Sequence, residues 1–314
     1  MEEQEIIKKF LDLGVQLTNE AFSMVKKDPD FFLAEIKKLK PRPFFITKDI
    51  LNKIIEKKER TDFRIIKTIQ LGKKALRVED YANFYLKKYE KIKEIFVQAG
   101  YSGMSINKIG ETTKEFWTIG VVKEKKKSSL VLEDPTGEID IFFDGIMRQK
   151  IDEFCRDDVV AVFCEKIKDR FVVKKISHPD IPLSREVKKT KDELFVKIEQ
   201  GDECVLSPNK YISPAFLQLD DIVFLLLPRK FFEALKFNIT SEDIAGLLKK
   251  RFLLPSTIDI AIGEIESLVL TELPDIIVTD LEPSLCKNYK GTTIISVFDK
   301  SYEVNLHTRE VKEL

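Results

Sequence analysis

The chain has 314 residues, 43% of them hydrophobic, which is enough for two or three domains with packed cores. Lys and Arg number 53, and Asp and Glu also number 53, so the net charge is zero and no whole-chain field attracts nucleic acid or an anionic membrane. We see no signal peptide and no apolar run of about 18 residues, so we expect a cytoplasmic protein that does not enter the membrane.

The cysteines and histidines argue against a metal centre. None of the cysteines forms a Cys-x-x-Cys pair, so we expect reduced, buried, structural thiols at Cys155, Cys164, Cys204 and Cys286. Histidine is the commonest metal ligand, but the chain has only His178, just before a proline, and His307, near the C-terminal end. We therefore expect no metal and no other cofactor.

Residues 1–60 predict a small helical domain. Between residues 2 and 13, apolar side chains recur at helical spacing on one face: Ile6, Ile7, Phe10 and Leu11. Capping residues open three further helices: Thr18, Asp28 before Pro29, and Thr47. Helical periodicity alone indicates packing or partner docking and nothing more specific.

Residues 61–113 form a connector. Its first part is irregular, with a candidate strand in "FRIIKTIQL", and a long amphipathic helix follows at residues 78–99. The aromatic side chains of this helix favour a core or an interface over a platform for nucleotide bases.

Residues 114–183 change to the spacing of strands. Five short strands, with a helix between the third and the fourth, follow the order of an OB-fold barrel, and "LEDPTGEIDIFF" supplies its Asp-Pro-Thr-Gly turn. Strand alternation favours Trp117 and Phe143 inside the barrel, although one sequence leaves open which face is inward.

A basic turn joins the first two of these strands, and aromatic residues flank it. OB-folds bind single strands with basic loops and stacking aromatic rings. One interpretation is a modest contact with the DNA backbone, and the alternative is a solvated hairpin on a packed barrel. The candidate nucleic-acid residues are Lys123, Lys125, Lys126, Lys127, Trp117 and Phe142.

Residues 184–192 are a charged linker, and residues 193–314 alternate strands with two helical pieces. An apolar strand ends at Thr279, and the loop after it carries Asp280, Leu281, Glu282 and Pro283. Such a loop, at the carboxyl end of a strand, is where many α/β enzymes keep metal ligands or nucleophiles. A final strand pair closes the chain in "SYEVNLHTREVKEL".

Taken in this order, the chain resembles the small subunit of the archaeal D-family DNA polymerase from about residue 78 onward. The stretches that carry the resemblance are "VEDYANFYLKKYEKIKEIF", "IGVVKEKKKSSLVLEDPTGEIDIFF", "FVVKKISHPDIPLSREVKKTKDELFVKI", "IAGLLKKRFLLP", "LTELPDIIVTDLEPSLCKNYKGTTIISV" and "FDKSYEVNL". The resemblance implies an α+β protein with a helical N-terminal domain, an OB-fold barrel and a calcineurin-like phosphoesterase domain built as an α/β sandwich.

The metal loops of that family are not retained. The family holds two metal ions with Asp-x-His, Gly-Asp, Gly-Asn-His-Asp and Gly-His-x-His loops. Here Gln200 and Asp202 occupy the first loop, and the last reads Asp280 to Pro283, where leucine and proline cannot bind a hard cation. The resemblance therefore implies a contracted, degenerate phosphoesterase domain without catalytic residues.

The implied function is that of a non-catalytic accessory subunit whose partner is the large catalytic subunit of a D-family DNA polymerase. Contact with single-stranded or primer-template DNA through the OB-fold is a further expectation. The alternatives are a metal-dependent 3′–5′ exonuclease with replaced ligands and a stand-alone single-stranded-DNA-binding protein. Apolar segments can serve as the partner surface or pack in the core: Phe224, Leu226, Phe231, Phe232, Phe252 and Leu253.

Overall fold

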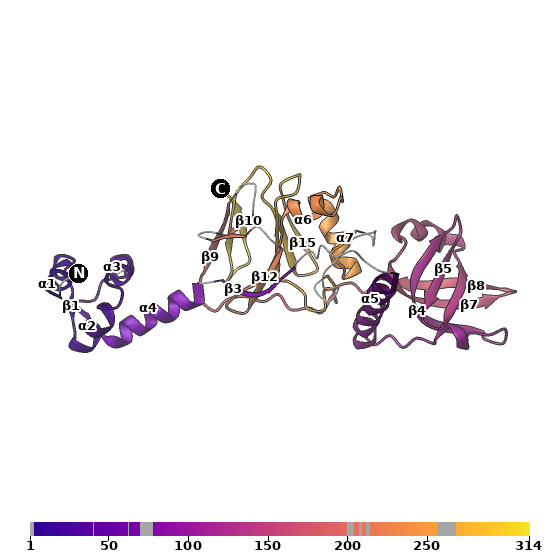
Figure 1. The fold of residues 1–314 in the computed structure, drawn as a ribbon, viewed down its shortest axis with the longest axis horizontal. Coiled ribbons are helices and arrows are strands. Elements are labelled where there is room, and N and C mark those ends of the chain that lie inside the picture. The colour runs from indigo at the N-terminus through magenta and orange to yellow at the C-terminus, as the bar shows by residue number, and fades with distance from the viewer. Residues whose placement is uncertain are drawn as a thin grey trace. The chain divides into compact units, whose positions relative to one another are not determined.

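The computed structural model describes residues 3–39, 41–61, 63–69, 78–199, 204–206, 209–211, 214–255 and 268–314. The chain forms two compact units, Met1–Arg64 and Ile65–Leu314 (Figure 1). The first is largely helical, and the second combines helices with several sheets. The expected mixture of helices and sheets is confirmed at this level.

The N-terminal unit contains the predicted helices. They are α1 (Glu3–Asp12), α2 (Asn19–Val25), α3 (Pro29–Lys38) and α4 (Lys48–Thr61), with a short parallel pair formed by β1 (Gln16–Leu17) and β2 (Phe45–Ile46). The Thr18 and Asp28 side chains accept the N–H groups of Ala21 and Phe31, at 3.3 and 3.2 Å, which satisfies donors that a helix start leaves unpaired.

The apolar face predicted for α1 is only half correct. Ile6 and Phe10 are 1% exposed and belong to the core of this unit, whereas Ile7 and Leu11 remain 45% and 49% exposed. The buried stripe is therefore narrower than the sequence pattern, because the small unit covers only one side of the helix.

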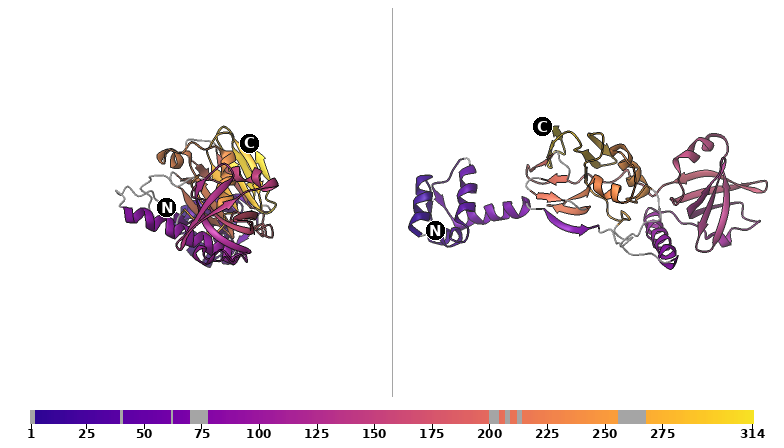
Figure 2. Two further views of the ribbon diagram at one scale, coloured as in Figure 1. Left: turned by 90° about the vertical axis from the view of Figure 1, so that its right-hand side faces the viewer. Right: turned by 45° about the horizontal axis from the view of Figure 1, so that its top comes forward.

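In the second unit, five strands close into a barrel in the order β4-β5-β6-β8-β7 (Figure 2). The strands are β4 (Glu115–Lys125), β5 (Ser129–Asp134), β6 (Gly137–Phe142), β7 (Val159–Ile167) and β8 (Arg170–Ser177). Within the barrel, β6 and β8 pair in parallel, and the other neighbouring strands pair antiparallel. The 3₁₀ segments are η1 (Ile106–Lys108), before the barrel, and η2 (Gly145–Glu153), which is the helix expected between the third and fourth strands.

Phe143 lies in the barrel core, as predicted, but Trp117 does not. Phe143 is 4% exposed among the core residues, together with Phe116. Trp117 follows Phe116 along β4 and points to the outer face, where its ring lies 5.4 Å from those of Tyr101 and Phe163. The assignment of Trp117 to the core of the barrel was wrong because strand alternation gives two faces without saying which one is inward.

Helix α5 (Val78–Gln98) covers the outside of the barrel (Figure 2). Tyr89, Ile92 and Phe96 are buried in a cluster that also contains Ile119 of β4, and the Tyr89 hydroxyl donates to the Ile119 carbonyl at 3.2 Å. Tyr89 and Phe96 of this helix therefore serve packing.

The C-terminal part contains two sheets. The six-stranded sheet has the order β15-β16-β14-β13-β12-β3, and the five-stranded sheet has the order β11-β10-β9-β17-β18. The first comprises β3 (Arg64–Thr68), β12 (Ala215–Leu219), β13 (Ile222–Leu227), β14 (Ile276–Thr279), β15 (Leu285–Tyr289) and β16 (Thr292–Ser296). The second comprises β9 (Phe195–Glu199), β10 (Cys204–Leu206), β11 (Asn209–Tyr211), β17 (Tyr302–Asn305) and β18 (Val311–Glu313).

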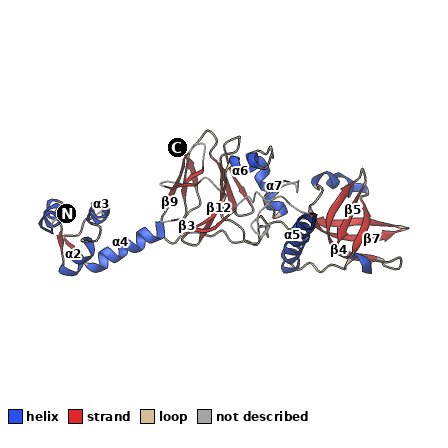
Figure 3. Ribbon diagram, viewed as in Figure 1, coloured by secondary structure: helices blue, strands red, loops and turns tan. Residues whose placement is uncertain are grey.

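The six-stranded sheet lies between the five-stranded sheet and a layer of short helices (Figure 3). These helices are α6 (Arg229–Ala234), η3 (Ser241–Asp243) and α7 (Ile244–Lys250). Leu225 and Leu227 of β13 join the cluster that contains Phe232 and Leu248 of the helices. Phe224, on the opposite face of β13, is also fully buried. Both faces of the central strands are thus covered, as continuous apolar strands require.

The candidate strand in "FRIIKTIQL" is confirmed as β3, and the last predicted strand pair as β17 and β18. β3 precedes the barrel in the chain but pairs beside β12 at the edge of the six-stranded sheet. The Ile69 N–H, just after β3, donates to the Pro214 carbonyl at 2.8 Å. The barrel is therefore inserted between strands of one sheet.

The expectation of buried thiols holds for one of the three cysteines whose side chains are described. Cys164 is buried in the barrel core, and burial raises the pKa of its thiol to about 12. Cys155 and Cys286 are exposed, and all three are free thiols. The side chain of Cys204 lies outside the described part of the chain.

Candidate functional site

The candidate site is the edge where β13, β14 and β16 end. These strands run parallel, so the loops that follow them meet at one edge. Asp280 follows β14 directly, and Arg229, at the start of α6, comes shortly after β13. The loop Asp280 to Pro283, where the resemblance implies the position of a lost metal loop, follows β14 at this edge.

Asp280 serves as a cap for α6. Its side chain is 6% exposed, and its carboxylate accepts the backbone N–H of Arg229, the first residue of that helix. Burial raises the pKa of the Asp280 carboxyl, and the N–H bond from Arg229 opposes the rise. Pro228, at the N-cap position, makes no side-chain cap, so the carboxylate reaches this helix start from a different strand.

The rest of the loop is held by the protein's own groups. Leu281 is 3% exposed, and its carbonyl accepts the hydroxyl of Ser296. The Ser241 hydroxyl donates to the Pro283 carbonyl at 2.6 Å, and the Ser241 N–H donates to the Glu282 carbonyl at 3.0 Å. The loop thus works as a bridge between the sheet and the segment that leads into α7.

Because of these contacts, few side chains of the loop are available as metal ligands. Glu282 is exposed, but Asp280 is occupied by α6 and Leu281 by the core. Across the described ranges, no three His, Cys, Asp or Glu side chains gather as a metal site. Gln200 and Asp202, which the resemblance implies at the position of the first metal loop, lie outside the described residues.

The two histidines lie elsewhere. The His307 Nδ1 atom is 2.8 Å from the Thr190 carbonyl oxygen, beside the linker. His178 stacks on Phe154 where the chain leaves the barrel, with ring centroids 4.6 Å apart. Burial lowers the pKa of His178 to about 4, so this imidazole is neutral at physiological pH.

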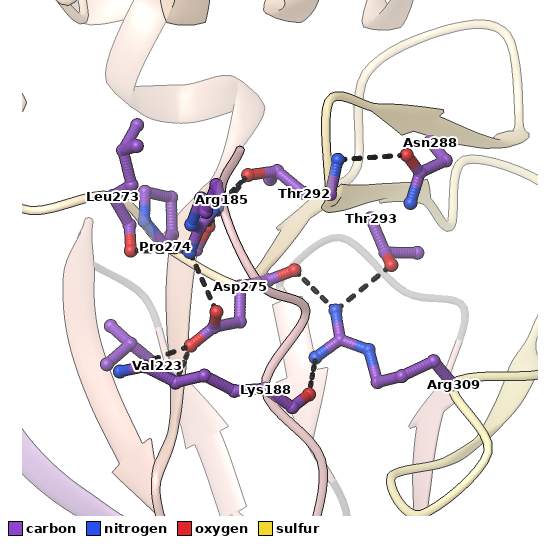
Figure 4. Close-up of polar contacts among 11 residues, drawn as sticks. Arg185, Lys188, Val223, Leu273, Pro274, Asp275, Asn288, Thr292, Thr293 and Arg309 are labelled. Atoms are coloured by element: carbon purple, nitrogen blue, oxygen red, sulfur yellow. Dashed lines mark hydrogen bonds and ion pairs between the residues drawn. The ribbon is translucent and has the colours of Figure 1, made fainter. Parts of the chain in front are cut away.

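A buried ionic network occupies the opposite edge, where the parallel strands begin (Figure 4). Asp275 is fully buried, and its carboxylate accepts Arg185 Nη2 at 2.7 Å and the Val223 N–H at 2.9 Å. Arg309 Nη2 donates to the Asp275 carbonyl at 2.6 Å and to the Thr293 hydroxyl at 3.1 Å. The network ties the segment after the barrel and the C-terminal hairpin to the starts of β13, β14 and β16.

Sequence reasoning missed this network. Arg185 stands in a charged segment, "SREVKKTKD", that reads as a solvated linker. The only signal was an aspartate directly before an apolar strand, at Asp275, which usually marks a turn rather than a buried ion pair. Burial lowers the pKa of the Arg185 and Arg309 guanidinium groups, and the charge of Asp275 opposes this.

The apolar residues considered for partner binding are all buried. Their exposed fractions lie between 0% and 3% for Phe224, Leu226, Phe231, Phe232, Phe252 and Leu253. They pack inside the second unit, so a partner cannot reach them on the folded surface. Of the two interpretations of these apolar segments, a partner surface or core packing, the structure supports core packing.

The basic turn of the barrel is paired with neighbouring acids. Lys123 forms ion pairs with Glu133, at 3.4 Å, and with Glu138 of β6. Lys126 forms one with Asp140 of β6 at 3.0 Å. These partners reduce the positive field that a phosphate backbone would meet.

The remaining candidates on the barrel are spread over different surroundings. Lys125 pairs with Asp152 at 3.1 Å, and Lys127 is exposed. Phe142 is half-buried, and the Arg170 guanidinium lies 5.0 Å from its ring centre. Trp117 lies against the rings described above, on the face toward α5, so the structure does not bring it together with Phe142 in one stacking platform.

Two further findings bear on function. None of the helices that the structure describes is both long and apolar enough to cross a bilayer. No protein-family model matches this chain, and no curated protein sequence matches it either. The function is therefore inferred from the fold and from these contacts.

Proposed function

We propose that this chain is a non-catalytic accessory subunit of a replicative DNA polymerase of the D-family type, and that it holds and positions the large catalytic subunit. The observation that carries the proposal is the role of Asp280. In the family that the sequence resembles, this loop holds metal ions. Here its carboxylate caps α6, and Leu281 is part of the core.

The architecture supports the proposal. Around the barrel the strands follow the order β4-β5-β6-β8-β7, so the last two strands of the barrel are exchanged relative to their order in the chain. The third strand, β6, pairs in parallel with the fifth, β8, and η2 lies in the chain between the third and fourth strands, β6 and β7. This arrangement supports assignment to the OB-fold class. Two sheets with helices on the outer face of one of them support a contracted phosphoesterase-like domain.

Electrostatics supports a scaffolding role over tight DNA binding. The chain has no net charge, and Lys123 and Lys126 of the basic turn are paired with acids. Affinity for nucleic acid depends on the number of phosphates that free cations neutralise. Any contact that the barrel makes with single-stranded or primer-template DNA is therefore weak and follows from the assembled complex.

The test is capture of partners from an extract of the source cells with the full tagged chain, with identification by mass spectrometry and a manganese-supplemented exonuclease assay. We expect a DNA polymerase large subunit to be recovered in stoichiometric amount and the purified chain to degrade no DNA. A chain that captures no polymerase subunit would overturn the proposal.

The two alternatives give different results in the same test. An exonuclease with replaced ligands would degrade DNA with manganese and lose that activity in Glu282→Gln, an exposed position where the substitution leaves the fold intact. A stand-alone single-strand binder would retain single-stranded DNA without any polymerase subunit and release it at moderate salt.

A further inference from the structure

The strand β15 forms one edge of the six-stranded sheet. On its inner side it pairs antiparallel with β16, from Leu285 opposite Ser296 to Tyr289 opposite Thr292, without a shift in register. Among the residues that the structure describes, no other strand pairs with β15, and no hydrogen bond outside this ladder involves its backbone. An edge strand of this kind offers a row of donors and acceptors with which a further strand can pair.

The turn after β15 determines which backbone groups point outward. Lys290 and Gly291 form a two-residue hairpin loop, and both have positive φ, 48° and 85°. In such a hairpin the residues that flank the loop form a hydrogen-bonded pair, and bonded pairs then alternate along the two strands. The N–H and C=O groups that point away from β16 therefore belong to Cys286 and Asn288.

The side chains of β15 alternate between the two faces of the sheet. Leu285 and Tyr289 pack against the cluster that contains Phe232 and Leu248, so Lys287, which lies between them in the strand, shares their face. The Lys287 side chain is exposed, and it forms no ion pair with any residue that the structure describes. On this face the edge therefore presents a lysine between two apolar side chains.

The strand is held in place at its turn. The Asp180 carboxylate accepts the Tyr289 hydroxyl at 3.0 Å and Lys290 Nζ at 2.6 Å, and Asn288 Oδ1 accepts the Gly291 N–H at 3.1 Å. A partner strand therefore meets an edge that is already ordered, and binding does not have to offset the ordering of β15.

The charge of Lys287 decides what can pair with this edge. A second copy that paired antiparallel about the centre of β15 would place Lys287 opposite its own counterpart, and like charges directly opposite each other destabilise a sheet. An acidic side chain in the same position forms a favourable cross-strand pair. Apolar side chains two residues to either side of it extend the apolar surface of Leu285 and Tyr289.

We propose that β15 binds an extended segment of a partner protein, which adds antiparallel to it as a further strand of the sheet. The segment carries an acidic residue opposite Lys287 and apolar residues two positions before and after it, opposite Tyr289 and Leu285. Its backbone pairs with the outward groups of Cys286 and Asn288. This edge does not depend on the accessory role proposed above, because any protein with such a segment can supply the strand.

The probe is the synthetic peptide Thr-Val-Thr-Glu-Thr-Val-Thr, added to the full chain and followed by amide NMR. We expect the amide signals of Cys286 and Asn288 to shift and their hydrogen exchange to slow. A peptide with lysine in place of the glutamate should bind roughly fivefold more weakly. Lys287→Glu should reverse this preference, whereas Lys312→Glu, an exposed change on the edge strand β18, should leave it unchanged.

N-methylation of the peptide tests the backbone pairing. With the glutamate opposite Lys287, the N–H groups of the two threonines beside it point at β15, and those of the two valines point away. Methylation of these two threonine nitrogens should abolish binding, whereas methylation of the two valine nitrogens should leave binding largely intact.

Several outcomes would overturn the proposal. They are no binding at millimolar peptide, equal binding of the glutamate and lysine peptides, and binding that survives methylation of the threonines beside the glutamate. A concentration-dependent dimer of the chain alone, with the amides of Cys286 and Asn288 protected, would assign the edge to a second copy and would overturn it as well.

Discussion

Arg185 Nη2 lies 2.7 Å from the Asp275 carboxylate, which is fully buried at the start of β14. The two residues are 90 positions apart in the chain, so this single contact joins the exit from the barrel to the middle of the C-terminal sheet. The Arg185 guanidinium also donates to the Leu273 and Pro274 carbonyls, at 3.0 Å each, which gives it several partners in one place.

Loss of this arginine should be costly. Arg185→Met leaves Asp275 buried with weaker compensation, and removing one partner of a buried pair destabilises a protein by roughly 3–5 kcal/mol. We expect a loss near the lower value, since Arg309 and the Val223 N–H remain close. Urea unfolding measures it. Lys189→Met, an exposed change in the same segment, is the control, and equal losses in the two variants would contradict the prediction.

The cap formed by Asp280 predicts a second stability effect. Asp280→Ala removes the acceptor for the Arg229 N–H, and loss of a helix cap costs about 1–2 kcal/mol. Glu282→Ala, two residues away and exposed, should change the free energy of unfolding by less than about 0.5 kcal/mol. Denaturant titration of the two variants side by side decides the matter: a larger loss in Glu282→Ala would mean that the cap contributes little.

The buried Lys88 predicts a dependence of stability on pH. Its pKa is about 8 in the folded chain and 10.5 as the ordinary value, so between these values the unfolded state binds more protons. The free energy of unfolding therefore rises with pH across this window, and Lys88 contributes at most about 1.4 kcal/mol per pH unit to the rise. Below pH 8 the lysine is charged in both states, so the full cost of burying its charge destabilises the folded state.

The comparison of wild type with Lys88→Met isolates this contribution. Measured by urea unfolding from pH 7.5 to 9.5, the stability of the wild type relative to the variant should increase with pH. Lys87→Met should run parallel to the wild type, because Lys87 is exposed. A wild-type curve parallel to that of Lys88→Met would place the pKa of Lys88 near its ordinary value.

The paired turn of the barrel predicts a gain of DNA affinity on removal of acids. In Glu138→Gln combined with Asp140→Asn, Lys123 and Lys126 lose their partners on β6. We expect tighter binding of single-stranded DNA than in the wild type and a salt dependence steeper by about one to two phosphate contacts. Fluorescence anisotropy at several salt concentrations measures both. Unchanged affinity would show that the turn does not face the nucleic acid.

Local patterns were enough to predict much of the fold. Caps such as Thr18 and Asp28 mark helix starts because they satisfy specific backbone donors, and those helices are present. The five barrel strands follow from alternation and turns. Which face of each strand points into the barrel could not be predicted in this way. Trp117 lies on the outer face because α5 supplies a second apolar surface there, and the local sequence pattern contains no information on that packing.

The buried charges could not be predicted. Lys88 lies within the apolar stripe of α5. The helix contains several lysines, and nothing in the sequence distinguishes Lys88 from the exposed ones. Its burial depends on Phe252, which is more than 160 positions away in the chain, and on Asp157 in the barrel. Asp280 resembles a remnant of a metal loop until the N–H of Arg229 is placed beside it.

The position of β3 has a consequence for how the chain is made. The ribosome produces β3 first, but its neighbour β12 begins only at Ala215, after the whole barrel. At about 5–20 residues per second, this strand waits roughly 7 to 30 seconds for its pairing partner. Ile65 and Ile66 are about half exposed in the folded protein. Before β12 is made, these side chains lack the neighbouring strand as well and are more exposed. The nascent chain thus carries an unpaired apolar strand until its second half emerges, and unpaired strands of this kind are prone to aggregation before they are covered.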